Sequence, residues 1–210
     1  MPAVARTWEF LSQCDGAPRR RSIGAAVLSA TLEIAPLPAR LSADCQREIA
    51  TRLQLDIGDV EPLSLARART RWPDYRRWVQ AANDWARTLA PGLGEVLAAS
   101  DIALMACRGA PCHHDGERYG DAAFCNLFLS DDRGLDVLFP CTGQRIALVR
   151  GTAMVFDTCQ PHAVVARGRD AFDAADFLPG EDWNQLFLTW ELPIEAPPVA
   201  TALGIVFDPP

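Results

Sequence analysis

Hydrophobic and polar positions follow a helical period in the first half of the chain. Between Leu41 and Leu55, apolar residues recur at every fourth position among charged ones, which predicts an amphipathic helix. From Tyr75 to Leu89 the apolar residues form one helical stripe. Pro73 suits the first turn of this second helix, and Pro91 follows its end. Two amphipathic helices are therefore expected, with their apolar faces packed against another layer.

After Gly94 the pattern changes to short β-rich runs separated by Gly, Pro, Asp and Asn, which is typical of an antiparallel sandwich or barrel. Val27–Ile34 and Leu203–Phe207 are expected to add edge strands. A long loop, of a length often seen in lids, is expected over Asp170–Trp183. The core strands are predicted at Asp101–Cys107, Pro111–Asp115, Phe124–Leu129, Leu135–Phe139, Arg145–Val149, Thr152–Phe156, His162–Arg167 and Gln185–Glu191.

The length of 210 residues fits one domain. We expect it to be mainly β with flanking helices (α+β), with residues 1–93 helical or extended and residues 94–210 forming the β core. No apolar run approaches the roughly 20 residues of a spanning helix, and the N-terminus lacks the order of a signal peptide. The seven cysteines form no CxxC pair, which speaks against a disulfide framework and favours the reducing cytoplasm.

The charged residues exclude some classes of function. All 20 cationic side chains are arginine, so mechanisms that need a lysine, such as Schiff-base chemistry, are excluded. The net charge of −7 argues against nucleic acid as the main partner, because neutralising phosphates needs an excess of cations. One cluster runs against this trend and is interpreted first as a solvated helix face and second as a docking surface for an acidic partner: Arg67, Arg69, Arg71, Arg76 and Arg77.

The candidate chemistry centres on the three histidines of the chain. His113 and His114 are adjacent and precede Asp115, and His162 follows 47 residues after Asp115. On a strand, residues two apart project to the same face, so His113 and Asp115 can offer a nitrogen and an oxygen to one cation while His114 points away. His162 can supply a third ligand from a neighbouring strand. Two histidines and one carboxylate leave open positions on a metal, as in non-haem iron(II) oxygenases.

Four segments resemble the iron(II)/2-oxoglutarate-dependent oxygenases: CHHDGERYG from Cys112, FCNLFLS from Phe124, LDVLFP from Leu135 and RGTAMVFDTCQPHAVVARG from Arg150. The resemblance covers nearly half of the chain. It implies a double-stranded β-helix, or jelly roll, with an HxD motif on the second core strand and a distal histidine on the seventh. It also implies that His113, Asp115 and His162 hold iron(II), that 2-oxoglutarate is the cosubstrate and that O2 is consumed in oxidising a small molecule or a side chain.

The sequence departs from the family where the far carboxylate of 2-oxoglutarate needs a buried cation, usually an arginine some ten residues past the distal histidine. Position 172 is Phe and position 173 is Asp. The nearest candidates are Arg167 and Arg169, with Arg150 as another; strict alternation from His162 aims Arg167 outward unless the strand ends or bulges at Gly168. Asn126, a polar residue in an apolar strand, either hydrogen-bonds the cosubstrate or faces outward.

Two alternatives stay open beside the oxygenase. A cupin-like metalloenzyme would keep the three metal ligands without 2-oxoglutarate, because the anchoring arginine is not at its usual place. A jelly-roll binding domain with structural histidines would have no catalytic role. We also expect Arg118 and Tyr119 either to line the substrate entrance or to lie in a surface loop.

Overall fold

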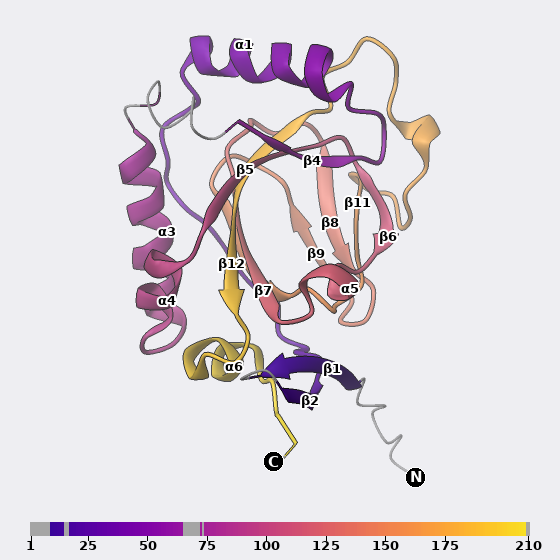
Figure 1. Ribbon diagram of the computed structural model, residues 1–210. Coiled ribbons are helices and arrows are strands. Elements are labelled where there is room, and N and C mark those ends of the chain that lie inside the picture. The colour runs from indigo at the N-terminus through magenta and orange to yellow at the C-terminus, as the bar shows by residue number, and fades with distance from the viewer. Residues whose placement is uncertain (1–8, 15–16, 65–71, 73, 209–210) are drawn as a thin grey trace.

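Two antiparallel sheets make up most of the computed structural model, which describes residues 9–14, 17–64, 72 and 74–208 (Figure 1). The larger sheet has the order β3 (Leu28–Thr31), β10 (Thr152–Asp157), β7 (Ala122–Phe128), β12 (Gln185–Pro193), β5 (Ile102–Cys107) and β4 (Val60–Leu63). The smaller sheet has the order β6 (Ala110–His113), β11 (His162–Ala166), β8 (Leu135–Phe139) and β9 (Gln144–Ala147).

The eight strands from β5 to β12 form a double-stranded β-helix, as predicted. The chain crosses between the sheets at β5–β6, β6–β7, β7–β8, β9–β10, β10–β11 and β11–β12, and every pairing is antiparallel. The central four strands of the larger sheet, β10-β7-β12-β5, therefore face β6-β11-β8-β9, which is the arrangement of a jelly roll. The strand predicted at Val27–Ile34 is confirmed as β3 on the edge of the larger sheet.

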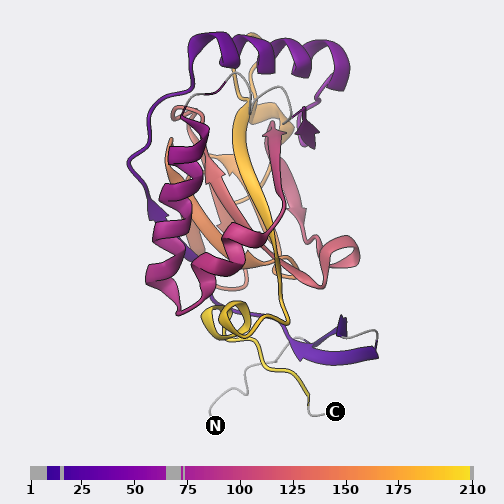
Figure 2. The same cartoon turned by 60° about the vertical axis from the view of Figure 1, so that its left-hand side comes forward.

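Helices from the N-terminal part cover the outer face of the larger sheet (Figure 2). The long helix α3 (Tyr75–Leu89) and the shorter α4 (Leu93–Ala99) lie along it, and α1 (Ala39–Glu48) continues into a π-helical turn at Ile49–Leu53. Trp78 on α3 is 1% exposed and belongs to the same apolar core as Trp190 of β12. The predicted packing of the second helix on a sheet is thereby confirmed.

Strand β12 does not alternate between apolar and polar residues, because it lies between the helices and the smaller sheet. Leu186, Leu188 and Trp190 belong to the core beneath the helices, whereas Phe187 belongs to the core between the two sheets. Both faces of the strand are buried, so the run QLFLTW is almost continuously apolar.

One predicted strand is wrong, two elements were not predicted, and part of the arginine cluster falls outside the described residues. Leu203–Phe207 is not a strand, because Leu203 ends α6 (Pro197–Leu203), a helix that Pro197 initiates and Gly204 terminates in a left-handed conformation. The edge strand β4 and the helix α4 are additional elements, and their short, mixed sequences gave no clear period. Arg67, Arg69 and Arg71 of the arginine cluster lie outside the described residues, and Arg76 and Arg77 are exposed on α3.

The first described strands and the last described helix lie beneath one end of the jelly roll (Figure 1). A hairpin of β1 (Glu9–Cys14) and β2 (Ala17–Ser22) lies beside α6 there (Figure 1). None of the helices among the described residues combines the length and the apolar character needed to cross a bilayer.

The core beneath the helices gives a prediction about stability. Leu188→Ala removes a side chain that is fully buried between β12 and the helices, so we expect the free energy of unfolding to fall by about 2–5 kcal/mol. Chemical denaturation followed by circular dichroism measures the change. Leu178→Ala is the control, because Leu178 is 56% exposed and its truncation should change stability by less than about 0.5 kcal/mol. Equal losses in both variants would contradict the assigned core.

Candidate metal centre

Three side chains converge at one end of the jelly roll: His113, Asp115 and His162. Their potential ligand atoms all lie within 4.8 Å of one another. The Nε2 atom of His113 is 3.8 Å from Asp115 Oδ1, and the Nε2 atom of His162 is 3.7 Å from Asp115 Oδ2. The two imidazole rings lie 4.5 Å apart. This spacing and donor set fit a single divalent ion of the kind that imidazole and carboxylate bind together.

The pairing of β6 with β11 brings the two histidines together. His113 is the last residue of β6 and His162 the first of β11, and the two are direct cross-strand partners. A register shift follows between His162 and Val164, so the regular ladder is broken beside the site. Side chains of directly opposed residues lie on the same face of a sheet, which is why both rings reach one point.

Asp115 reaches the site in a way that strand alternation did not predict. The expected strand Pro111–Asp115 ends at His113, and Asp115 instead precedes the short helix α5 (Gly116–Tyr119). Its backbone N–H donates to Thr158 O at 2.8 Å, which ties it to the turn before His162. His114 is exposed, and its Nδ1 accepts the N–H of Gly116 at 3.2 Å. His114 therefore lies outside the cluster, as predicted, but a turn rather than strand alternation directs its side chain away.

Backbone carbonyls orient both rings for metal binding. The Nδ1 atom of His113 lies 2.7 Å from Pro111 O, and that of His162 lies 3.0 Å from Gln160 O. A carbonyl oxygen only accepts hydrogen bonds, so Nδ1 carries the proton in each ring and donates it. Each Nε2 is left with a lone pair directed toward Asp115. In metal sites, acceptors such as these carbonyl groups fix the tautomer and the orientation of the histidine ligands.

His162 stands against an apolar wall. Its ring centroid is 5.0 Å from that of Phe156 and 5.9 Å from that of Phe139, and the residue is only 8% exposed. Burial, with a smaller contribution from the nearby His113, lowers the pKa of His162 from 6.5 to about 4, against the opposing effects of Gln160 O and Asp115. His162 is therefore neutral near pH 7, and the neutral form is the one that ligates a metal.

Asn126 faces the interior, so the outward-facing alternative is wrong, and a hydrogen bond to the cosubstrate stays a prediction. It lies on β7 opposite Met154 of β10 and Thr189 of β12. Met154 belongs to the core between the sheets, which places Asn126 and Thr189 on that inner face. Both are 8% exposed, and neither Asn126 Oδ1 nor Thr189 Oγ1 has a hydrogen-bond partner among the described residues. Thr189 was missed, although it shows the same sequence signal of a polar residue in an apolar strand.

The predicted arginines lie outside the space between the sheets. Arg167 Nη1 and Nε pair with Asp132 and Asp136 at 2.8 and 3.0 Å. Asp136 lies between the inward-facing Leu135 and Val137 on β8, so its carboxylate and Arg167 are on the outer face of the smaller sheet. The ion pairs raise the pKa of Arg167.

The two other candidate arginines, Arg169 and Arg150, also form ion pairs with carboxylates. Arg169 pairs with Asp176 at 2.7 Å, and Arg150 with Asp131. A role of Arg167 or Arg169 in holding a cosubstrate stays a prediction, and it would require the guanidinium to leave its carboxylate partners.

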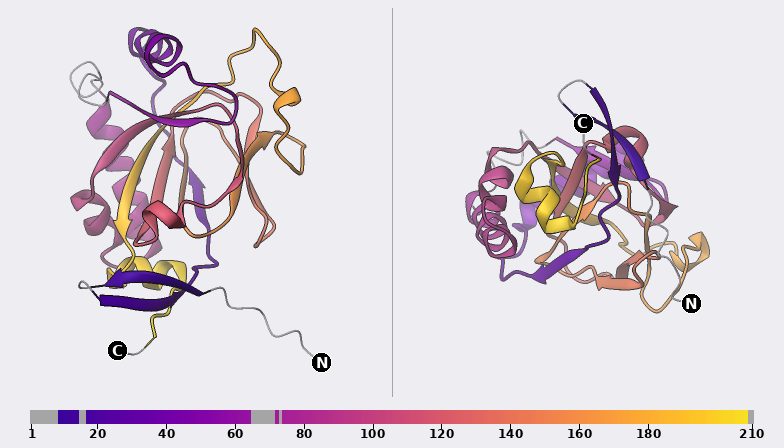
Figure 3. Two further views of the ribbon diagram at one scale, coloured as in Figure 1. Left: turned by 45° about the vertical axis from the view of Figure 1, so that its right-hand side comes forward. Right: turned by 90° about the horizontal axis from the view of Figure 1, so that it is seen from below.

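The loop Asp170–Trp183 and the helix α5 lie toward opposite ends of the jelly roll (Figure 3). Phe177 is 3% exposed and enters the core between the sheets. A Cβ atom on Gly109, just before β6, would lie 2.4 Å from the Phe177 ring, so this loop packs where β6 begins. The candidate metal centre lies where β6 ends. The loop is confirmed, but it closes the opposite end of the jelly roll rather than covering the candidate metal centre.

No protein-family model matches the chain, and no curated protein matches it. Similar solved structures include a prolyl-4-hydroxylase from Pseudomonas putida (19% identity, TM-score 0.45, covering 81% of this chain and 93% of that chain). The 2OG complex of the viral collagen prolyl hydroxylase vCPH from Paramecium bursaria Chlorella virus-1 is similar at 11% identity and a TM-score of 0.41, covering 81% and 96% of the two chains. The α-ketoglutarate-dependent epimerase SnoN is similar at 15% identity and a TM-score of 0.37, covering 81% and 78%.

The adjacent histidines provide a matched test of the ligand set. His113→Ala removes a ring whose Nε2 faces Asp115, so we expect cobalt(II) affinity to fall by about 100-fold or more, as for loss of a direct ligand. His114→Ala removes an exposed ring that points elsewhere and should change the affinity by only a few-fold. Calorimetric titration of the metal-free protein with cobalt(II) measures both. Similar losses in the two variants would contradict the assignment.

Burial of His162 predicts a pH dependence for the metal-free protein. Its pKa is about 4 in the folded state and near 6.5 in the unfolded chain, so the unfolded chain binds more protons between these values. The free energy of unfolding should therefore fall as the pH is lowered from 6.5 to 4, by up to about 3 kcal/mol from this residue. Urea denaturation across this range, compared with His162→Gln, isolates the contribution. An identical pH dependence in both proteins would contradict it.

Proposed function

We propose that this protein is an iron(II)- and 2-oxoglutarate-dependent oxygenase that oxidises a C–H bond of a small molecule or of an exposed side chain. The observation that carries the proposal is the convergence of His113, Asp115 and His162 at the mouth of a double-stranded β-helix. We also propose a cytoplasmic location, which is supported by free thiols at all six cysteines whose side chains the structure describes.

The three ligands suit ferrous iron. Two neutral imidazole nitrogens and one carboxylate oxygen on one side of an ion leave three positions of an octahedron for exchangeable ligands. The carboxylate of Asp115 supplies a negative charge to the cation, and the carbonyls of Pro111 and Gln160 hold the two rings in the ligating tautomer. When bound together, iron(II), 2-oxoglutarate and O2 would supply the oxidising power for C–H cleavage.

The inner face offers hydrogen-bonding groups for a cosubstrate. Asn126 and Thr189 are register partners on neighbouring strands and bring to the same face an amide oxygen and a hydroxyl that have no partner among the described residues. Asn126 lies one inward-facing step along β7 from Phe124, which is the register partner of Phe156, and Phe156 contacts the ring of His162. Buried polar atoms without partners are rare in folded proteins, so this pair supports a polar ligand next to the metal. We propose Asn126 and Thr189 as cosubstrate-binding residues, with Arg167 and Arg169 retained as candidates for the far carboxylate.

The substrate is proposed to enter beside α5. Tyr119 packs edge-on against Phe124 with ring centroids 5.1 Å apart, and the guanidinium of Arg118 lies 5.1 Å from the centroid of Tyr119. Arg118 is exposed and Tyr119 half-buried, directly after the ligand Asp115. A flat aromatic surface next to a cation suits a substrate with an apolar body and a negatively charged or polar group.

A second candidate function is a metalloenzyme of the same fold that does not use 2-oxoglutarate. The location of Arg167 and Arg169 on carboxylates outside the inner face favours it. Anaerobic titration of the iron(II)-loaded protein with 2-oxoglutarate separates the candidates, because chelation of ferrous iron by a 2-oxo acid produces a visible charge-transfer absorption. The first candidate predicts this absorption, and the second predicts iron binding without it.

Turnover tests the proposed reaction. With iron(II), 2-oxoglutarate and O2, the wild-type protein should release succinate, and Asp115→Ala should reduce the release to background because the ion loses its carboxylate ligand. Nuclear magnetic resonance of the reaction mixture measures succinate. Glu117→Gln, an exposed acidic residue on α5, is the matched control and should retain activity. A wild-type protein that binds neither iron(II) nor cobalt(II) would exclude both enzymatic candidates.

A further inference from the structure

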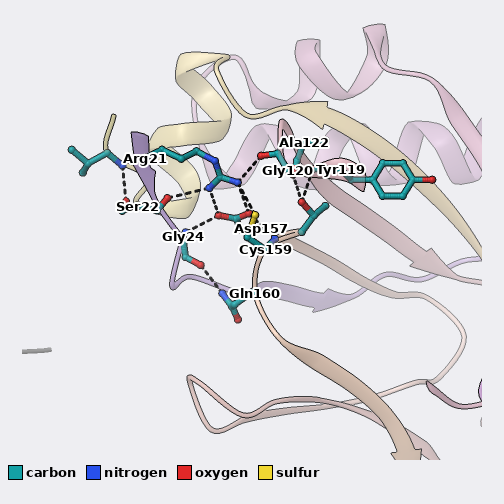
Figure 4. A network of polar contacts seen from close by, with 11 residues as sticks. Arg21, Ser22, Gly24, Tyr119, Gly120, Ala122, Asp157, Cys159 and Gln160 are labelled. Atoms are coloured by element: carbon teal, nitrogen blue, oxygen red, sulfur yellow. Dashed lines mark hydrogen bonds and ion pairs between the residues drawn. The ribbon is translucent and has the colours of Figure 1, made fainter. Parts of the chain in front are cut away.

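Arg21, at the end of β2, is the only arginine that is buried among the residues whose side chains the structure describes. Its side chain and that of Asp157 are both 0% exposed, and the two form an ion pair (Figure 4). Arg21 lies in the N-terminal hairpin, far in sequence from the candidate ligands. A charge buried this deeply is costly unless several groups satisfy it, so its partners indicate what it does.

The guanidinium of Arg21 forms hydrogen bonds with several groups at once. Nη1 and Nη2 donate to the two carboxylate oxygens of Asp157 at 2.6 and 3.0 Å. Nη2 also donates to Gly120 O at 2.7 Å and to Cys159 Sγ at 3.2 Å. The bidentate geometry fixes the plane of the guanidinium, which a single-point contact would not do. One side chain thereby fixes two separate segments of backbone.

These two segments carry two of the candidate metal ligands. Gly120 directly follows α5, the helix that begins after Asp115. Asp157 and Cys159 belong to the turn between β10 and β11, the strand that begins with His162. Arg21 thus links the segment after one ligand to the segment before the other.

Thr158 also connects the segment that follows Asp115 with the segment that precedes His162. Its carbonyl accepts the N–H of Asp115 at 2.8 Å, and its hydroxyl lies 2.6 Å from Tyr119 O and 2.8 Å from Ala122 O and can donate to either of them. A Cβ atom on Gly116 would lie 2.7 Å from Cys159 Sγ, so the two segments are in direct contact. A small rotation of the Asp157–Cys159 turn would therefore move Asp115 as well as His162.

Other contacts hold Arg21 in place. Ser22 N–H donates to Val206 O at 2.8 Å, and Asp208 N–H donates to Arg20 O at 2.9 Å. Gly24 N–H donates to Asp157 Oδ2 at 2.8 Å on the other side of the pair. The strand end that carries Arg21 is thus held by the C-terminal segment and by Asp157 itself.

We propose that Arg21 is a positioning residue of the metal centre, which holds Asp115 and His162 at the spacing that one ion requires. The inference rests on the metal-binding part of the proposed function and goes beyond it in assigning a role to the N-terminal hairpin. Arg21 does not touch the metal ligands, and it acts through Asp157, Cys159 and Gly120.

Two variants test the role. The double variant Arg21→Met/Asp157→Asn leaves no unpaired buried charge, and its single amide oxygen can still accept the backbone N–H of either Gly24 or Cys159. Arg21→Lys keeps the charge but lacks the planar fork that reaches Asp157 and Gly120 together. We expect cobalt(II) affinity to fall by about 10- to 100-fold in the double variant, and by less in Arg21→Lys.

The readouts separate positioning from stability. Calorimetry gives the cobalt(II) affinity, the visible absorption of bound cobalt(II) reports the ligand geometry, and circular dichroism reports folding and the melting temperature. Arg145→Met is the control. It removes an ion pair with Asp136, which is buried and retains Arg167 as a partner, on the far side of the smaller sheet. It should leave the cobalt(II) spectrum unchanged and the affinity within about twofold.

The outcomes are distinct. Weaker binding and an altered cobalt(II) spectrum in the Arg21 variants, but not in Arg145→Met, support the inference. An unchanged affinity and spectrum in the folded double variant overturn it. If the double variant does not fold, an unchanged affinity and spectrum in Arg21→Lys overturn it. A wild-type protein that binds no cobalt(II) overturns the proposed metal centre itself.

Discussion

The pairing of β6 with β11 is the constraint on which the candidate site depends. Two histidines that are 49 positions apart become direct cross-strand partners, and each ring is fixed by a carbonyl two residues earlier in the chain. On its other edge, β11 pairs with β8 over Ala163–Ala166, which holds β11 in place beside β6. The register shift after His162 frees the first residue of the strand from the regular ladder. The approach of the two rings thus follows from backbone geometry, and the contacts of Arg21 are proposed to maintain the spacing.

The distribution of polar groups divides the molecule into three environments. The face beneath the helices is apolar, the outer face of the smaller sheet carries ion pairs around Asp136, and the inner face is apolar except for a few groups such as Asn126 and Thr189. A metal at the end of the inner face would therefore lie between solvent and a region of low dielectric. An unpaired charge in such a region raises the free energy of the folded protein, so a bound cation and the carboxylate of Asp115 would stabilise each other strongly.

Much of the core could be read from the sequence because periodicity reports burial. Leu135–Phe139 is confirmed as a strand with the same bounds, and the position of His162 at the start of a strand is also confirmed. His113 and Asp115 lie close together for a local reason other than the predicted one, because a turn and α5 replace the expected strand. Turn geometry leaves no hydrophobic period, so alternation could not have revealed it.

Long-range contacts could not be predicted from the sequence, for a different reason. Arg21 lies in a run of three arginines that is typical of an exposed loop, and its burial depends on Asp157, which is 136 positions away. Asp157 ends β10 shortly before His162, and nothing in the sequence around it indicates its buried partner. A charged residue shows no sign of burial in a single sequence when its counter-ion comes from a distant element.

The contacts of the N-terminal hairpin also set an order of assembly. Ser22 bonds to Val206 across 184 positions, and Arg21 reaches Gly120 across 99. The hairpin is synthesised before the strands of the jelly roll, but Val206, which holds it, is synthesised after all eight of them. The strands can pair while the hairpin is still undocked, whereas its contacts with Val206 and Asp208 form only after those residues have been made. The support that we propose Arg21 gives to the candidate metal centre is accordingly completed after the strands that carry the ligands.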